Sequence, residues 1–402
     1  MKKTIIFLSL FMALGSVYYF QPVAYEILKL KTFDSFIQEK EESGNFVVLN
    51  ITEEDIANEG GYPLSRQTLA QIHINLLRQG AMGVGWVMAF PQPDRFGGDF
   101  EFTEALKFSP SVLAMFEGKG EYPPTSGTVI LGPENTGGMM ATGVIQNIDV
   151  LKHNASQGIA VARTDADNLI RRLPLLMRTP DGWVSSYGTE VLKVLAGADT
   201  YVIRTNDNGV EEVRVKGLPP VKTDSLGRKW ISWVVPRETS LAEMDVENRF
   251  VFVGFTAKGI MPQLATPVGL LEPHKIQAAL AESILIQDSP YIPDYALALE
   301  LLIFLFSLVF VWLVLNVFGI TWGVSFFAVV FASTAFYGVS TIQNGILIDV
   351  TWALVSQFIT ATVAFYLRFR EQYKLRQQIK KQFEHYLDKR QVAILQKSPE
   401  KL

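Results

Sequence analysis

The chain has 402 residues, enough for two or three domains, and no cysteine, which excludes disulfides, thiolate metal sites and cysteine nucleophiles. Its hydrophobic content of 49% is high for a soluble protein. Residues 368–402 carry ten Lys and Arg against four Asp and Glu. Because the whole chain has a net charge of −4, the part before this basic segment is acidic. An acidic middle argues against a nucleic-acid partner.

The first apolar segment covers residues 4–20 and follows Lys2 and Lys3 directly. Two interpretations fit it: a retained signal anchor over residues 1–22, or a signal peptide cleaved near the small residues Ala13 to Ser16. In both cases the two lysines stay inside. Residues 23–293 are therefore predicted to be extracytoplasmic.

The predicted extracytoplasmic domain alternates strand and helix signals. A buried strand at 46–51 precedes a helix at 65–78, with Ser65 as its cap and Gly80 after its end, and a strand follows at 83–90. This βαβ order predicts an α/β domain, a mixed sheet with helical crossovers. Further strands are expected at 128–131, 159–162, 201–204, 210–215 and 250–254, and a helix at 276–286. Residues 206–209, Asn-Asp-Asn-Gly, predict a hairpin turn between the strands at 201–204 and 210–215. Residues 91–158, rich in Gly and Pro, give no clear pattern.

Three more apolar segments lie in residues 294–367, at about 295–316, 319–340 and 346–367, each near the ~20 residues that cross a bilayer. Glu300 and Asp349 are the acidic residues within them. For Glu300 we favour an interfacial acid that reaches toward solvent over a functional one. Arg368 and Arg370 place the following tail in the cytoplasm. The sequence thus predicts a multi-pass protein of the cell (inner) membrane with both termini cytoplasmic.

No catalytic constellation is evident in the sequence. Residues 254–259 look faintly like a phosphate loop but lack its lysine and hydroxyl pair. Asp165 and Asp167 have the opening spacing of a calcium loop, yet Leu176 stands where the bidentate glutamate is required. We therefore expect no metal, no cofactor and no catalytic residue, and favour a binding module over an enzyme.

The extracytoplasmic domain resembles the type-two member of the CHASE group, the cyclase/histidine-kinase-associated extracellular sensory domains. Three motif blocks carry the resemblance, which extends over most of residues 45–290. They are Pro63-Leu-Ser-Arg66 with Gly80-Ala81 and Phe90, Asp165-Ala-Asp167-Asn168 with Arg171-Arg172-Leu-Pro174-Leu175, and Val253-Gly254 with Thr266-Pro267. Val87 stands where the family usually has an acid. Asn168 stands where the family usually has a glycine, and asparagine is tolerated there because it also accepts a positive φ.

The resemblance implies a sensory role for an unknown extracytoplasmic ligand. Five charged residues of the motif blocks are the candidate ligand-binding residues: Arg66, Asp165, Asp167, Arg171 and Arg172. The arginines could receive an anionic ligand through bidentate contacts. Alternatively, all five form salt bridges and turns that hold the sheet edges together, and we favour this structural interpretation.

Residues 368–402 are predicted to form a basic helical connector. The spacing of Arg376, Ile379, Phe383, Tyr386 and Arg390 suits a short two-helix seam, which predicts a homodimer with Ile379, Phe383 and Tyr386 as signal-connecting residues. The segment from Phe383 onward resembles the one before class III nucleotidyl cyclase domains. We therefore expect a cytoplasmic output domain, an adenylate cyclase, that this chain lacks. The alternatives are a basic helix lying on anionic lipid, a stand-alone sensor or scaffold acting on a separate partner, and another effector such as a kinase.

Overall fold

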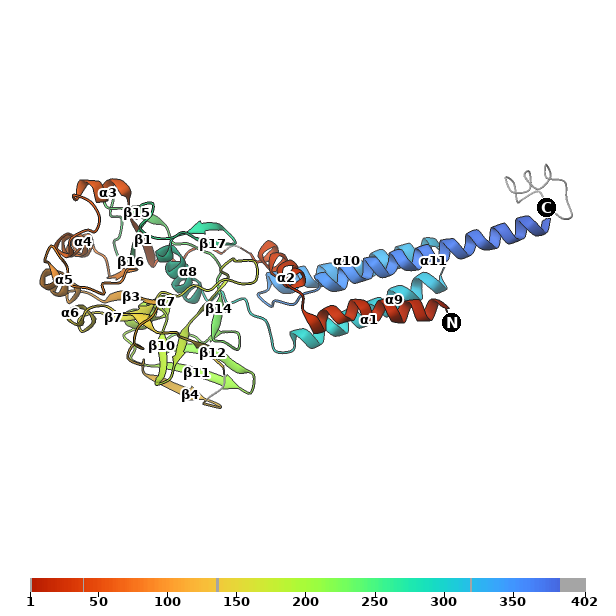
Figure 1. Ribbon diagram of the computed structural model, residues 1–402, viewed down its shortest axis with the longest axis horizontal. Coiled ribbons are helices and arrows are strands. Elements are labelled where there is room, and N and C mark those ends of the chain that lie inside the picture. Colours follow the sequence, from red (N-terminus) through yellow and green to blue (C-terminus); the bar gives the residue numbers. More distant parts are fainter. Residues whose placement is uncertain (1, 39, 135–136, 319, 384–402) are drawn as a thin grey trace. The chain divides into compact units, whose positions relative to one another are not determined.

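The structure is a computed structural model that describes residues 2–38, 40–134, 137–318 and 320–383 (Figure 1). The chain divides into two compact units. The helical unit comprises Met1–Ser35, Pro293–Thr341 and Ile348–Leu402, and the α/β unit comprises Phe36–Ile292 and Ile342–Leu347.

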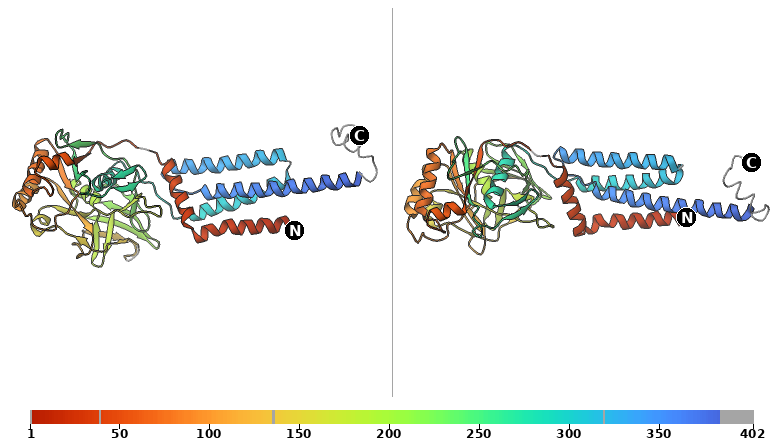
Figure 2. Two further views of the ribbon diagram at one scale, coloured as in Figure 1. Left: turned by 45° about the horizontal axis from the view of Figure 1, so that its top comes forward. Right: turned by 90° about the horizontal axis from the view of Figure 1, so that it is seen from above.

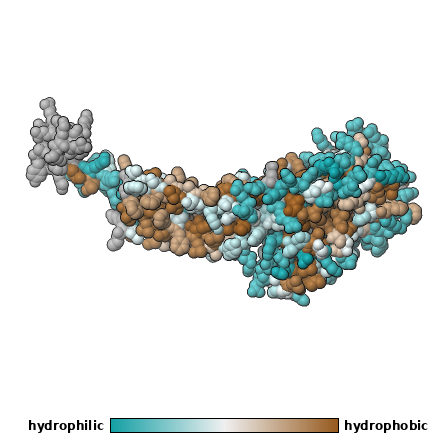
Figure 3. All heavy atoms as spheres, turned by 180° about the vertical axis from the view of Figure 1, so that it is seen from behind, coloured by the Kyte–Doolittle hydropathy of each residue, from teal (hydrophilic) through white to brown (hydrophobic). Residues whose placement is uncertain are grey.

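The helical unit contains five helices in its described residues: α1 (Lys2–Phe20), α2 (Val23–Phe36), α9 (Ala296–Val317), α10 (Ile320–Gln343) and α11 (Thr351–Phe383). Four of them, all but α2, are long and apolar enough to cross a membrane. Figure 2 shows these four side by side, with α11 reaching past the ends of the others. Apolar residues cover much of their surface in Figure 3, as expected for helices that face lipid. These helices match the four predicted spans.

Glu300 corrects one expectation in this unit. Its side chain is 1% exposed and does not reach solvent. It accepts hydrogen bonds from Lys29 Nζ at 3.2 Å and from the backbone N–H of Asp349 at 2.9 Å. Lys29 lies on α2, a helix that was not predicted from the sequence. Because a buried charge requires a partner, the pairing with Lys29 explains why an acid is tolerated on α9.

The core of the α/β unit is a seven-stranded sheet in the order β15-β1-β16-β2-β3-β6, with β7 also paired to β3. Its pairs are parallel except for β3 with β6. The strands are β1 (Phe46–Ile51), β2 (Gly83–Trp86), β3 (Ser111–Glu117), β6 (Val144–Ile145), β7 (Ser156–Ile159), β15 (Glu238–Ser240) and β16 (Phe250–Phe255).

Helices cover both faces of this sheet (Figure 1). Val47 and Leu49 of β1 point into one apolar core and Phe46 and Val48 into the other, because side chains alternate along a strand. The first core is closed by α3 (Glu53–Asn58), α4 (Arg66–Arg78), α5 (Asp99–Leu106) and α6 (Asp149–Lys152). The second is closed by α7 (Tyr187–Leu195) and α8 (Pro273–Leu285). A sheet buried on both faces accounts for the continuous apolar strands in the sequence.

Smaller sheets complete the α/β unit. Their orders are β10-β9-β5, β13-β12-β11-β4, β14-β8 and β17-β18. Their strands are β4 (Thr128–Leu131), β5 (Met139–Met140), β8 (Arg172–Pro174), β9 (Leu176–Thr179), β10 (Gly182–Ser185), β11 (Tyr201–Asn206), β12 (Gly209–Val215), β13 (Val221–Lys222), β14 (Arg228–Trp230), β17 (Leu264–Thr266) and β18 (Gly269–Leu271). The predicted hairpin is confirmed as β11 and β12, with Asn206 opposite Gly209.

The α/β fold class is confirmed, and the differences are local. The strand expected at 83–90 ends at Trp86. Val87 still donates to the Val253 carbonyl of β16 at 2.9 Å, but the N–H of Phe90 bonds the Asn147 side chain at 2.7 Å instead of a neighbouring strand. The strand expected at 159–162 is displaced to Ser156–Ile159. The stretch 91–158, for which no pattern was evident, contains strand β3 of the seven-stranded sheet and helix α5. Short elements bounded by glycine and proline leave too few residues for a period to emerge.

Candidate functional site

A cavity of about 780 Å³ lies at the carboxyl edge of the seven-stranded sheet. Its walls come from the ends of β16 and β3 and from the segment after β2, together with the first turns of α4 and α8. The carboxyl edge of a parallel sheet is where α/β proteins bind ligands, because the loops there converge. Most lining side chains are apolar or aromatic, including Met88, Phe90, Phe116, Phe255, Met261 and Ile276.

Arg66 is the one residue among the five predicted ligand-binding residues that lines this cavity. It is the first residue of α4, whose N-cap Ser65 accepts a hydrogen bond from Thr68 N, as predicted. Its guanidinium bonds Asp99 and the carbonyl oxygen of Gln92, and stacks 5.2 Å from the centroid of the Phe90 ring. Arg66 therefore fastens the segment between Phe90 and Asp99 that forms one wall of the cavity.

Two other polar residues of the cavity wall are also held by neighbours. The Glu117 carboxylate accepts hydrogen bonds from Arg163, the shortest at 2.6 Å. The Gln277 amide accepts from Gly188 N at 3.1 Å and donates to the Val161 carbonyl at 3.3 Å. These contacts fix the shape of the wall before any ligand arrives.

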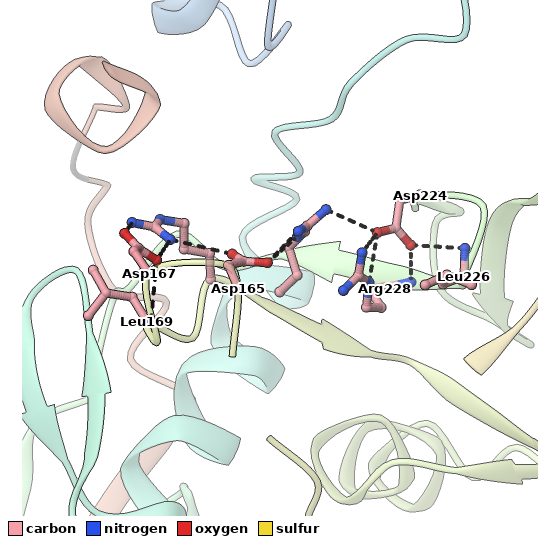
Figure 4. Close-up of polar contacts among 8 residues, drawn as sticks. Asp165, Asp167, Leu169, Asp224, Leu226 and Arg228 are labelled. Atoms are coloured by element: carbon pink, nitrogen blue, oxygen red, sulfur yellow. Dashed lines mark hydrogen bonds and ion pairs between the residues drawn. The ribbon is translucent and has the colours of Figure 1, made fainter. Parts of the chain in front are cut away.

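The other four predicted residues meet in a separate ion network, formed by Asp165, Asp167, Arg171, Arg172, Asp224 and Arg228 (Figure 4). Arg171 is fully buried and donates to both oxygens of Asp167 at 2.7 Å, with Asp165 at 3.5 Å. Arg172 joins Asp165 to Asp224, which is bound in turn by Arg228 at 2.7 Å. The hydrogen bond from Arg171 lowers the pKa of Asp167 below its ordinary value.

The ion network holds a loop against a strand pair. Asn168 adopts φ +63°, the conformation anticipated for the position where the family has glycine, and Asp165 N bonds the Leu169 carbonyl at 2.8 Å. The Arg172 guanidinium also lies 5.5 Å from the Trp230 ring, across the β8–β14 pair. Three arginines balance three aspartates, so the arrangement favours the structural interpretation. The ligand-binding role of these residues stays a prediction.

Helix α8 links the cavity to the segments through which the chain enters and leaves the α/β unit. Its first turn lines the cavity through Pro273, Ile276 and Gln277. In its last turn the buried Glu282 accepts hydrogen bonds from the N–H and hydroxyl of Ser43, in the segment between α2 and β1. Burial raises the pKa of Glu282. Nothing in the sequence pattern had singled out this residue.

The outgoing segment is held by a second buried charge. Lys229 of β14 is fully buried and donates to the carbonyl oxygens of Trp230, at 3.0 Å, and Asp288, three residues after the end of α8. Ser232 also donates to the Asp288 carbonyl, at 3.3 Å. Burial lowers the pKa of Lys229 to about 7. The incoming and outgoing segments are thus each fixed by an ionisable side chain rather than by apolar packing alone.

The predicted signal-connecting residues fall partly within the structure. Ile379 lies on α11 with 43% of its surface exposed, and Phe383 is the last residue of that helix. Tyr386 lies outside the described residues. An exposed isoleucine on a long helix is available for a partner, as a two-helix seam requires.

Most residues of the cavity wall were missed by sequence reasoning. Met88 to Arg95 follow a buried strand and contain Pro91 and Pro93, so a strand ending in proline-rich chain was the available signal. Val87, which replaces the family's usual acid, is 1% exposed and belongs to the apolar core rather than to the cavity wall.

Comparison with known proteins gave one match. The model of the family described as CHASE2 domain matches residues 5–317. No curated protein and no solved structure matches the chain. The matched residues include the whole cavity wall, the ion network and α8.

Proposed function

Because the chain belongs to the CHASE2 domain family, the extracellular sensory domains of signalling proteins, we propose that it is a transmembrane receptor. The α/β unit binds a small ligand in the cavity outside the cell membrane. The helical unit passes the resulting change to a cytoplasmic output. One observation supports this most directly: α8 has its first turn in the cavity wall and its last turn on the incoming segment.

The relay depends on α8 moving as a rigid body. Eleven of its 13 residues are buried, and Pro273 and Glu282 are about 14 Å apart along the helix axis. A ligand that favours one position of Pro273 and Ile276 therefore also favours one position of Glu282 and Ser43. A ligand can shift the receptor in this way only if it binds the two states with different affinities.

The membrane topology of the proposal follows from charge. Lys2 and Lys3 precede α1, and Arg368 and Arg370 follow the apolar part of α11. The positive-inside rule puts these residues in the cytoplasm of a cell (inner) membrane and the α/β unit outside. Helix α11 has 33 residues, about 50 Å, which exceeds the ~30 Å hydrocarbon core and carries the signal beyond the bilayer.

The absence of cysteine makes this topology directly testable. Leu226→Cys, in the α/β unit, should react with a membrane-impermeant maleimide on intact spheroplasts. Leu375→Cys, on α11, should react only after permeabilisation; both positions are exposed. Equal labelling of the two cysteines before permeabilisation would contradict the proposed topology.

The cytoplasmic output in this proposal is a nucleotidyl cyclase, engaged by a dimer of α11 helices through Ile379 and the residues after it. The test uses the gene from its own start to its own stop codon in a bacterium that lacks adenylate cyclase. Wild type should give cyclic AMP. Glu282→Gln should change the level at equal expression, because the amide replaces one of the two accepting oxygens by an NH2 group, which cannot accept the hydrogen bond that this oxygen receives from Ser43.

Glu243→Gln is the matched control, since Glu243 is exposed in the loop before β16, and it should leave cyclic AMP unchanged. No cyclic AMP from the wild type, together with a separate effector protein bound to residues 368–402, would replace the fused cyclase by a partner acting in trans. Equal cyclic AMP from wild type and Glu282→Gln would overturn the relay through α8.

A further inference from the structure

The walls of the cavity indicate what kind of molecule it takes. Its volume of about 780 Å³ falls in the range of small-molecule sites. Phe90, Phe116 and Phe255 contribute aromatic surface, and Met88 and Ile276 add aliphatic surface. Such walls gain free energy by removing apolar ligand surface from water. The main body of the ligand is therefore apolar.

The acidic groups of the wall are already satisfied. Glu117 is paired with Arg163 at 2.6 Å. The Asp94 carboxylate accepts hydrogen bonds from the backbone N–H groups of Arg66, at 2.7 Å, and Phe96, at 3.1 Å. A cationic ligand would have to compete with these contacts, so the wall offers little to a positive charge.

The two arginines of the cavity wall differ in whether their guanidinium groups have a partner. Arg66 is bound to Asp99 and to a backbone carbonyl. Arg95 also lines the cavity, but within the described part of the chain its guanidinium makes no hydrogen bond or ion pair and lies 4.5 Å from the Phe96 ring. Its five donors remain available, and a planar guanidinium suits a carboxylate or similar anion.

We propose that the cavity takes a small organic anion with an apolar body, whose acidic group binds Arg95 and whose body contacts Phe90, Phe255 and Ile276. This inference rests on the proposed function and specifies the chemical class of its ligand. Contact with Ile276 couples the ligand to α8, and the anionic group determines selectivity.

The experiment compares probes that differ only in charge. Full-length chain in nanodiscs of uncharged lipid is titrated by calorimetry with phenylacetate and 4-phenylbutyrate, with the matching neutral amides, and with the matching ammonium compounds. Empty nanodiscs correct for partition into lipid. Wild type should bind the acids about tenfold more tightly than the amides, since a charge-assisted hydrogen bond is gained, and the ammonium compounds least tightly.

Three substitutions and one control locate the contact. Arg95→Met should remove the preference for acid over amide while amide binding persists, and Arg95→Lys should retain part of it. Arg78→Met is the matched control, because Arg78 is an arginine of α4 outside the cavity wall, and it should behave as wild type. Ala162→Trp, which places a large side chain in the cavity wall, should abolish saturable binding of both probe types.

Several results would overturn the inference: equal affinity for acids and amides, tighter binding of the ammonium compounds, no saturable binding of either acid, or an acid preference that survives Arg95→Met. These results bear on the ligand class alone. The relay through α8 is judged separately, by the cyclic AMP response to Glu282→Gln.

Discussion

The ion network and the cavity wall both contain arginines, but the two regions differ in whether each guanidinium is paired with a carboxylate. In the network Arg171 is fully buried, and three arginines face three aspartates. In the cavity wall Arg66 is paired, whereas Arg95 is exposed and stacks on Phe96. A paired, buried arginine holds a fold together, and an unpaired one at a cavity can receive a ligand. Arginine-to-methionine substitutions, which remove the charge but keep an unbranched stem, can test this comparison.

Arg171→Met should give the largest effect. It leaves the carboxylate of Asp167 buried without its bidentate partner, which costs about 3–5 kcal/mol. The free energy of unfolding of the α/β unit would be measured by urea titration with tryptophan fluorescence. A loss below about 1 kcal/mol would contradict the structural interpretation of the ion network.

Asp167→Asn should destabilise the α/β unit by about 1.5–3 kcal/mol near neutral pH, because charge-assisted hydrogen bonds to Arg171 are lost. The pKa of Asp167 is lowered in the folded state. The ionised carboxylate therefore stabilises the folded state fully above its unfolded pKa of about 4, and this stabilisation is lost as the pH falls through the pKa of the folded state. The difference between wild type and variant should therefore narrow in acid. A difference that stays constant down to about pH 2 would contradict the ion pair.

Arg66→Met should have an intermediate effect, about 1–3 kcal/mol. Its partner Asp99 is 26% exposed, so the carboxylate can recover hydration when the guanidinium is lost. The same urea titration measures it, and Arg78→Met serves as a surface control expected to lie within 0.5 kcal/mol of wild type. An Arg66→Met loss equal to that of Arg171→Met would remove the distinction between the two regions.

Arg95→Met should have the smallest effect on stability, within about 0.5 kcal/mol of wild type, because no hydrogen bond or ion pair in the described residues depends on its guanidinium. Its effect should instead fall on the preference for anionic probes. A loss of stability comparable with that of Arg66→Met would show that Arg95 is structural and would end the contrast with the ion network.

Much of the architecture could be predicted from the sequence because local signals carried it. Apolar segments of about 20 residues identified the four helices that are long and apolar enough to cross a membrane. The strand at 46–51, the Ser65 cap and the 206–209 turn were each determined by a few adjacent residues, and each was confirmed. The three motif blocks were sufficient to indicate the family that matches residues 5–317.

The tertiary structure alone decided which distant residues meet. A Cβ on Gly254 would lie 2.3 Å from the His274 ring, so the glycine of one motif block is required by the close approach of α8 to β16. Glu282 meets Ser43 across 239 residues, and Lys229 meets Asp288 across 59. Sequence periodicity reports which face of an element is buried, but not which charge lies opposite. Which charge lies opposite decides that Arg66 pairs with Asp99 and Arg171 with Asp167, and that the guanidinium of Arg95 stays available.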